Sequence, residues 1–115
     1  MKMKLESFLS AAASVLCLWM LVGCGSGQKR LNPATDTVVI SQMKFQPDVL
    51  YVNKWDTVVW VNEDMVGHDV TQLPDKTWTS DTIQPGYNWR SVVRENTDYF
   101  CSIHPTMKGK VIIRE

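Results

Sequence analysis

Beyond residue 35 the sequence is a series of short apolar runs separated by turn residues, and none of it keeps the spacing of an amphipathic helix. Apolar and polar residues alternate along 42–46 and 50–53, whereas 57–61 is apolar on both faces, as in a central strand. We predict strands within 38–46, 50–53, 57–61, 70–73, 89–94, 99–101 and 111–113. Gly, Pro, Asn and Asp residues lie between most of these runs. About seven short strands at this spacing predict an all-β sandwich or barrel in a single domain.

The first 35 residues differ in composition from the rest of the chain, and we expect them to lie outside the folded domain. Lys2 and Lys4 precede an apolar run over 8–22, which is typical of an export signal. The run ends in Leu-Val-Gly-Cys at 21–24, which resembles a bacterial lipoprotein signal with the cysteine as the lipidated residue. We predict a signal peptide over 1–23, a flexible tether over 24–35 with lipid on Cys24, and a folded domain over 36–115. An uncleaved anchor with an incidental cysteine is the alternative.

Charge and cysteine usage argue against a nucleic-acid-binding protein and against a fold held together by disulfide bonds. The chain has 12 basic and 12 acidic side chains, so the basic surface of a nucleic-acid-binding protein is not expected. Of the three cysteines, Cys17 leaves with the signal and Cys24 carries lipid, so a disulfide framework cannot form. Cys101 would then be a lone thiol outside the cytoplasm, where it must be either buried or bound to avoid oxidation.

The residues near Cys101 indicate a metal site. The two histidines of the chain are His68 and His104, and two residues separate Cys101 from His104 and His104 from Met107. Two imidazoles, a thiolate and a weak thioether are the ligands of a type 1, or blue, copper site. Each residue taken alone has an ordinary explanation in packing or solvation, and zinc could also occupy the Cys-His-His set. Together they predict a single copper ion that alternates between Cu(I) and Cu(II).

These residues lie in segments that resemble the plastocyanin and amicyanin group of cupredoxins. The resemblance rests on DTVVWVN at 56–62, on His68, and on YFCSIHPTMKGKV at 99–111. It covers essentially the whole predicted domain. The two-residue gap before Met107, with Pro105 directly after the second histidine, is most similar to amicyanin.

The resemblance implies both a fold and a function. The fold is an eight-stranded Greek-key sandwich, with His68, Cys101 and His104 as equatorial copper ligands and Met107 as the axial ligand. The function is one-electron transfer outside the cytoplasm, with electrons leaving through His104 and an apolar patch around it. Candidates for that patch are Met65, Val66, Pro105 and Thr106.

Three positions depart from the pattern of the group. Trp55 stands where glycine is common, so we expect that turn to avoid positive φ or to be reshaped. Asn96 is expected to supply left-handed geometry where a glycine is usual. Asp69 follows the first histidine, where the group often has an asparagine that ties the ligand loops together. An inward carboxylate would favour Cu(II) and lower the reduction potential, whereas one facing solvent would do neither. Candidates for side chains that support the ligands are Asn62, Asp69 and Pro105.

The predicted protein is a monomeric electron carrier, anchored through Cys24 to a bacterial membrane in the cell envelope, with transient protein partners. The alternative is a copper carrier or storage lipoprotein that uses the same ligands. An enzyme is not expected, because catalysis needs an open coordination position or a second metal, and the chain has no third histidine to build one.

Overall fold

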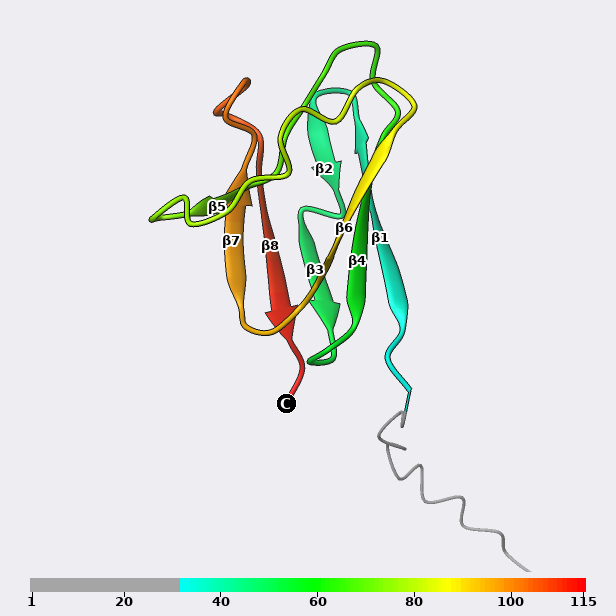
Figure 1. Cartoon of the computed structure of the whole chain (residues 1–115), viewed down its shortest axis with the longest axis vertical. Helices are drawn as coiled ribbons and strands as arrows, with labels where there is room; N and C mark the ends of the chain where they lie inside the picture. The colour runs from blue at the N-terminus through cyan, green and yellow to red at the C-terminus, as the bar shows by residue number, and fades with distance from the viewer. Residues whose placement is uncertain (1–31) are drawn as a thin grey trace, which may run out of the picture.

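The computed structural model describes residues 32–115, which form two four-stranded sheets packed face to face (Figure 1). The strand order is β2-β1-β4-β6 in one sheet and β3-β8-β7-β5 in the other. The strands are β1 (Thr35–Ser41), β2 (Lys44–Gln46), β3 (Val49–Val52), β4 (Thr57–Asn62), β5 (Thr71–Leu73), β6 (Asn88–Val92), β7 (Thr97–Phe100) and β8 (Lys108–Ile113). The described residues contain no helix, and so none that could cross a membrane. The predicted all-β sandwich is confirmed.

The N-terminal predictions fall largely outside this region. The signal peptide over 1–23, Cys24 and most of the tether over 24–35 lie outside the described residues. β1 begins at Thr35, one residue before the predicted start of the domain.

The run over 38–46 is two strands and not one. Gln42 and Met43 both have positive φ (53° and 58°) and reverse the chain between β1 and β2. Two consecutive residues with positive φ match the tight hairpin turn whose hand suits the twist of the flanking strands. The sequence lacks the usual Asn-Gly signal for this turn. The bonds that support it come instead from Asp64, whose carboxylate accepts the N–H groups of Gln42 (2.7 Å) and Met43 (3.0 Å).

Strand pairing brings two loops together at one end of the sandwich. β1 runs parallel to β4, from Thr35 opposite Thr57 to Ile40 opposite Asn62. β7 lies between β5 and β8 and is antiparallel to both. The loop after β4 and the loop after β7 therefore leave the sheets at the same end (Figure 1), where the Ser102 N–H donates to Asp69 (2.8 Å).

The core lies between the two sheets and combines aliphatic residues with a group of aromatic rings. The ring of Tyr99 meets the rings of Phe45 and Trp60 edge to face, with centroids 4.8 and 5.5 Å apart. Gly109, opposite Tyr99 on β8, makes room for this ring, because a Cβ there would lie 2.4 Å from it. Further fully buried side chains are Val38, Ile40, Val52, Val58 and Val70. Each such aliphatic side chain stabilises the fold by about 1.5 to 3 kcal/mol relative to exposure.

Two predictions about turns are wrong. Trp55 has φ 77°, so the turn before β4 keeps the positive φ that a side chain disfavours. A hydrogen bond from the Trp55 N–H to the Val93 carbonyl (2.8 Å) holds that backbone in place. Asn96 does not have positive φ, and its Oδ1 accepts the N–H of Ile113 (2.7 Å).

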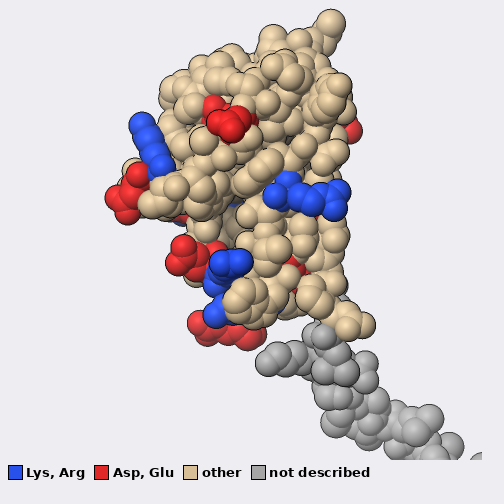
Figure 2. Space-filling model, in the orientation of Figure 1, with Lys and Arg blue, Asp and Glu red and all other residues tan. Residues whose placement is uncertain are grey.

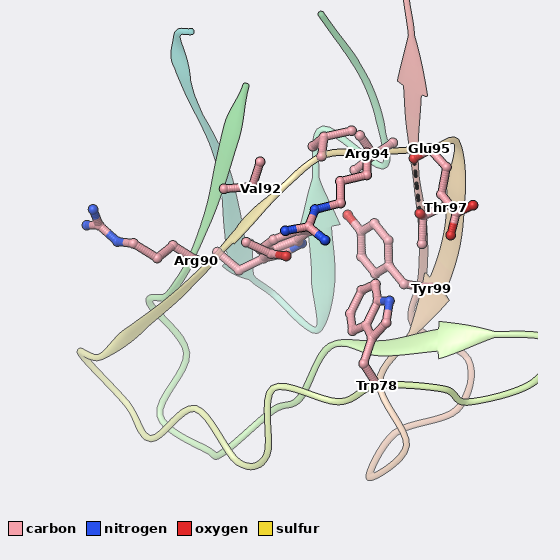
Figure 3. A pocket seen from close by; sticks show the side chains of 11 residues that line it. Trp78, Arg90, Val92, Arg94, Glu95, Thr97 and Tyr99 are labelled. Carbon is pink, nitrogen blue, oxygen red and sulfur yellow. Dashed lines mark hydrogen bonds between the residues drawn. The ribbon is translucent and has the colours of Figure 1, made fainter. Parts of the chain in front are cut away.

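The surface carries charges of both signs, and a cavity opens at one edge of the sandwich. Figure 2 shows lysine and arginine side chains interspersed with aspartate and glutamate, with no extended patch of one sign on the face in view. A cavity of about 500 Å³ opens between the sheets beside β6, and Trp78, Arg94 and Tyr99 are among its lining residues (Figure 3). None of the four predicted copper ligands lines this cavity.

Candidate metal centre

The loop after β4 places His68 inside the sandwich. The imidazole is fully buried, and the backbone of His68 pairs with Ile83 through N–H···O bonds of 3.2 and 2.6 Å. Asn62, at the end of β4, shapes the loop before it. The Asn62 amide donates to the carbonyls of Val66 and Ile83 (both 2.8 Å), and its oxygen accepts the N–H of Asp64 (2.9 Å).

The loop after β7 carries the other three predicted ligands. The N–H of Met107 donates to the His104 carbonyl, and the N–H of Cys101 donates to the Met107 carbonyl, both at 3.0 Å. These bonds close the loop on itself, so that Cys101 and Met107 are buried while His104 is partly exposed. Pro105, in the middle of this loop, is exposed and has no N–H to leave unpaired.

Three donor atoms from the two loops converge. Cys101 Sγ lies 3.8 Å from His68 Nδ1 and 3.9 Å from His104 Nδ1, and the two nitrogens are 3.2 Å apart. Metal–nitrogen and metal–sulfur bonds of about 2.0 to 2.3 Å hold trigonal donors about 3.5 to 4 Å apart. The three residues therefore fit one metal ion, and a thiolate with two imidazoles is the equatorial set expected for copper.

Asp64 fixes the orientation of the His68 ring. Its Oδ2 lies 2.8 Å from His68 Nε2, which places the ring proton on Nε2 and leaves the Nδ1 lone pair for the metal. Partial burial would raise the pKa of Asp64. The hydrogen bonds from Met43, His68 and Gln42, together with the attraction of His68, outweigh burial and lower that pKa below 3.8. This role of Asp64 was not predicted from the sequence, in which the turn at 42–43 that also binds its carboxylate lies 21 to 22 positions away.

Asp69 faces inward, which resolves the alternative that the sequence left open. The side chain is 5% exposed. Its Oδ1 accepts the Ser102 N–H (2.8 Å) and the Thr71 hydroxyl (3.0 Å), and its Oδ2 accepts the Ser102 hydroxyl. The Asp69 N–H points at Cys101 Sγ (3.4 Å). Asp69 therefore ties the two ligand loops together, with Ser102 as a partner that the sequence did not reveal.

The predicted apolar patch lies at the same end of the molecule. Met65 is 93% exposed and Val66 is 46% exposed on the loop after β4, while Pro105 and Thr106 are exposed on the loop after β7. Ile103, which the prediction did not include, is also exposed, at 47%.

Comparison with known proteins agrees with this geometry. No protein-family model matches the sequence. Amicyanin from Paracoccus denitrificans is 29% identical over 82 residues, covering 66% of this chain and 63% of that protein. Amicyanin-alpha from Methylorubrum extorquens is 31% identical over 88 residues, covering 70% of this chain and 74% of that protein. The chain belongs to the amicyanin family.

Solved structures support the same assignment. A Cu(I) form of an amicyanin variant superimposes with a TM-score of 0.65 at 26% identity, covering 74% of this chain and 87% of that one. A copper-containing nitrite reductase from Thermus scotoductus superimposes with a TM-score of 0.64 at 29% identity, but the match covers only 23% of that longer chain. The predicted membership of the plastocyanin and amicyanin group is confirmed.

Proposed function

We propose that the chain binds one copper ion at a type 1 site and carries single electrons between proteins. The observation that carries this proposal is the convergence of Cys101 Sγ with the Nδ1 atoms of His68 and His104. Solved amicyanin structures include Cu(I) and oxidised forms, so the same fold accommodates both redox states. Copper bound here would supply one-electron chemistry, with Met107 as the weak fourth donor.

The protein groups around the donors suit a site that changes little between redox states. His68 is held by Asp64 on one side and by its backbone pairing with Ile83 on the other. Cys101 is fully buried and lies in a loop closed by its own hydrogen bonds. Such prior positioning of ligands reduces the reorganisation that would otherwise slow an electron-transfer step.

His104 is the exit that we propose for the electron. It is the partly exposed member of the set, and it lies between the exposed residues Ile103 and Pro105. We expect these side chains, together with Met65, Val66 and Thr106, to form a small docking surface beside the imidazole, which suits brief contacts. The mixed charges visible in Figure 2 offer little long-range steering toward one partner.

We also propose that the protein is a monomer held at a membrane of the cell envelope through lipid on Cys24. β1 begins at Thr35, at the end of the sandwich opposite the ligand loops, because Thr35 pairs with the first residue of β4 and Ile40 with the last. A tether joined there leaves the copper end free to meet partners. An electron carrier is favoured over an enzyme, since residues 32–115 bring no further histidine to the site.

The test is the absorption and EPR spectrum of the full-length chain in detergent, with one equivalent of Cu(II). We expect an intense thiolate-to-copper band that disappears in a Cys101→Ser variant and reversible reduction in the unmodified protein. Tight Cu(I) binding without colour would indicate a copper carrier or storage protein instead. A preference for zinc with no coloured copper form would reject the redox function.

A further inference from the structure

Asp69 is a buried carboxylate without a cationic partner in the part of the chain that the structure describes. It is 5% exposed, and neither salt bridge among residues 32–115 includes it. An unpaired negative charge taken out of water costs free energy unless hydrogen bonds and a nearby cation compensate it. A metal ion held by Cys101, whose Sγ lies 3.4 Å from the Asp69 backbone nitrogen, would supply such a positive charge.

The hydrogen bonds of Asp69 are of the kind that a carboxylate accepts. Its partners are the Ser102 N–H and the hydroxyls of Ser102 and Thr71, all of which can donate to it. A carboxylate is an acceptor only, and it is stabilised by several convergent donors. These bonds also join the residue that follows His68, Asp69 itself, to the residue that follows Cys101, Ser102.

A neutral side chain at position 69 could also tie the two ligand loops together, so the negative charge is not needed for that purpose. An amide oxygen at position 69 could still accept the Ser102 N–H, and its NH₂ group could donate to the Ser102 hydroxyl. What an amide cannot supply is the negative charge. In a buried site that charge acts on a neighbouring ion with little screening, and it attracts Cu(II) more strongly than Cu(I).

We propose that Asp69 is a positioning residue whose buried charge lowers the reduction potential of the copper, an inference that rests on the copper site proposed above. The electron held by Cu(I) leaves more readily because Asp69 stabilises the Cu(II) state that remains. The same charge adds more to the stabilisation of the fold by Cu(II) than to its stabilisation by Cu(I).

The experiment is a spectroelectrochemical titration of the full-length, copper-loaded protein and three variants at pH 7. Asp69→Asn removes the charge, and we expect the ratio of Cu(II) to Cu(I) affinity to fall about tenfold, which raises the potential by about 59 mV. Ser102→Ala keeps the charge but removes a hydroxyl donor, so its potential should fall or stay unchanged. Asp75→Asn removes an exposed charge in the turn after β5, and no shift is expected.

A second readout does not depend on electron transfer. In thermal unfolding, Asp69→Asn should reduce the rise in Tm produced by Cu(II) more than the rise produced by Cu(I), and should not lower the Tm of the copper-free protein. If Asp69→Asn does not fold, Asp69→Ser provides the same loss of charge.

The outcomes separate the two proposals. An unchanged potential in Asp69→Asn would overturn the role of the charge, and so would an equal rise in Ser102→Ala, because loop geometry would then explain the shift. Absence of the thiolate band in the unmodified protein would overturn the copper site itself.

Discussion

Replacing Gly109 with alanine should displace the ring of Tyr99, its neighbour in the same sheet, and so disturb the packing of that ring against the other sheet. A Cβ at position 109 would lie 2.4 Å from the Cζ and hydroxyl oxygen of Tyr99 and 2.7 Å from Cε2. Tyr99 cannot move away easily, because it is fully buried and its ring packs against Phe45 and Trp60. Overpacking of a rigid core costs about 1 to 3 kcal/mol, and contacts this short favour the upper end.

The expected loss of about 3 kcal/mol lowers the Tm of a domain of this size by about 12 to 24 °C. The assay is thermal unfolding of the copper-free protein, followed by near-UV circular dichroism. Gly86→Ala is the matched control. Gly86 has φ 82° and no atom within 4 Å of an added Cβ, so only backbone strain of about 1 kcal/mol is expected there.

A double-mutant cycle tests the cause. In a Tyr99→Leu background the ring is gone, so the additional cost of Gly109→Ala should fall by about 2 kcal/mol. An equal cost in both backgrounds, or a Tm for Gly109→Ala within a few degrees of the unmodified protein, would refute the packing argument.

Three further predictions concern single side chains. Asp64→Ala removes the carboxylate on Nε2 of His68 and should weaken copper binding about 10- to 100-fold, measured by competition with a chelator; an unchanged affinity would contradict the orienting role. Burial raises the pKa of Tyr99 to about 12, although the Trp60 indole opposes this, so the fold should lose stability between pH 10 and about 12. Urea unfolding should show a smaller alkaline loss in Tyr99→Phe, and an equal loss would point to other groups. Trp55→Gly removes the backbone strain of a side-chain-bearing residue at positive φ, and because the indole is largely exposed, the domain should gain about 1 kcal/mol of stability in urea unfolding. A loss of stability would show that the contacts of the indole contribute more than the strain costs.

The sequence predicts where most strands lie, but it does not predict the residues at which β7 and β8 begin. The alternation over 50–53 and the double-faced run over 57–61 correspond to β3 and β4 within a residue. In contrast, β7 and β8 begin at Thr97 and Lys108, before their apolar residues, because pairing between them extends over polar positions. The ladder depends on backbone groups, which the side-chain pattern does not report.

The class of fold and the chemistry of the site could both be predicted from the amino-acid sequence. Turn residues at short intervals exclude helices, and the Cys101–His104–Met107 spacing brings three donors into one closed loop. Both are local properties, since they depend on residues that are close in the chain. The type of ligand was also readable, because a thiolate and imidazoles are recognisable from residue identity alone.

The side chains that support the site could be identified only from contacts between segments that are distant in the sequence. Asp64 reaches the turn at Gln42 across 22 positions, and Asp69 reaches Ser102 across 33. A carboxylate on a loop has no local feature that tells whether it will face solvent or the donors of a distant strand. Its orientation is set when the two sheets pack and the loops after β4 and β7 meet.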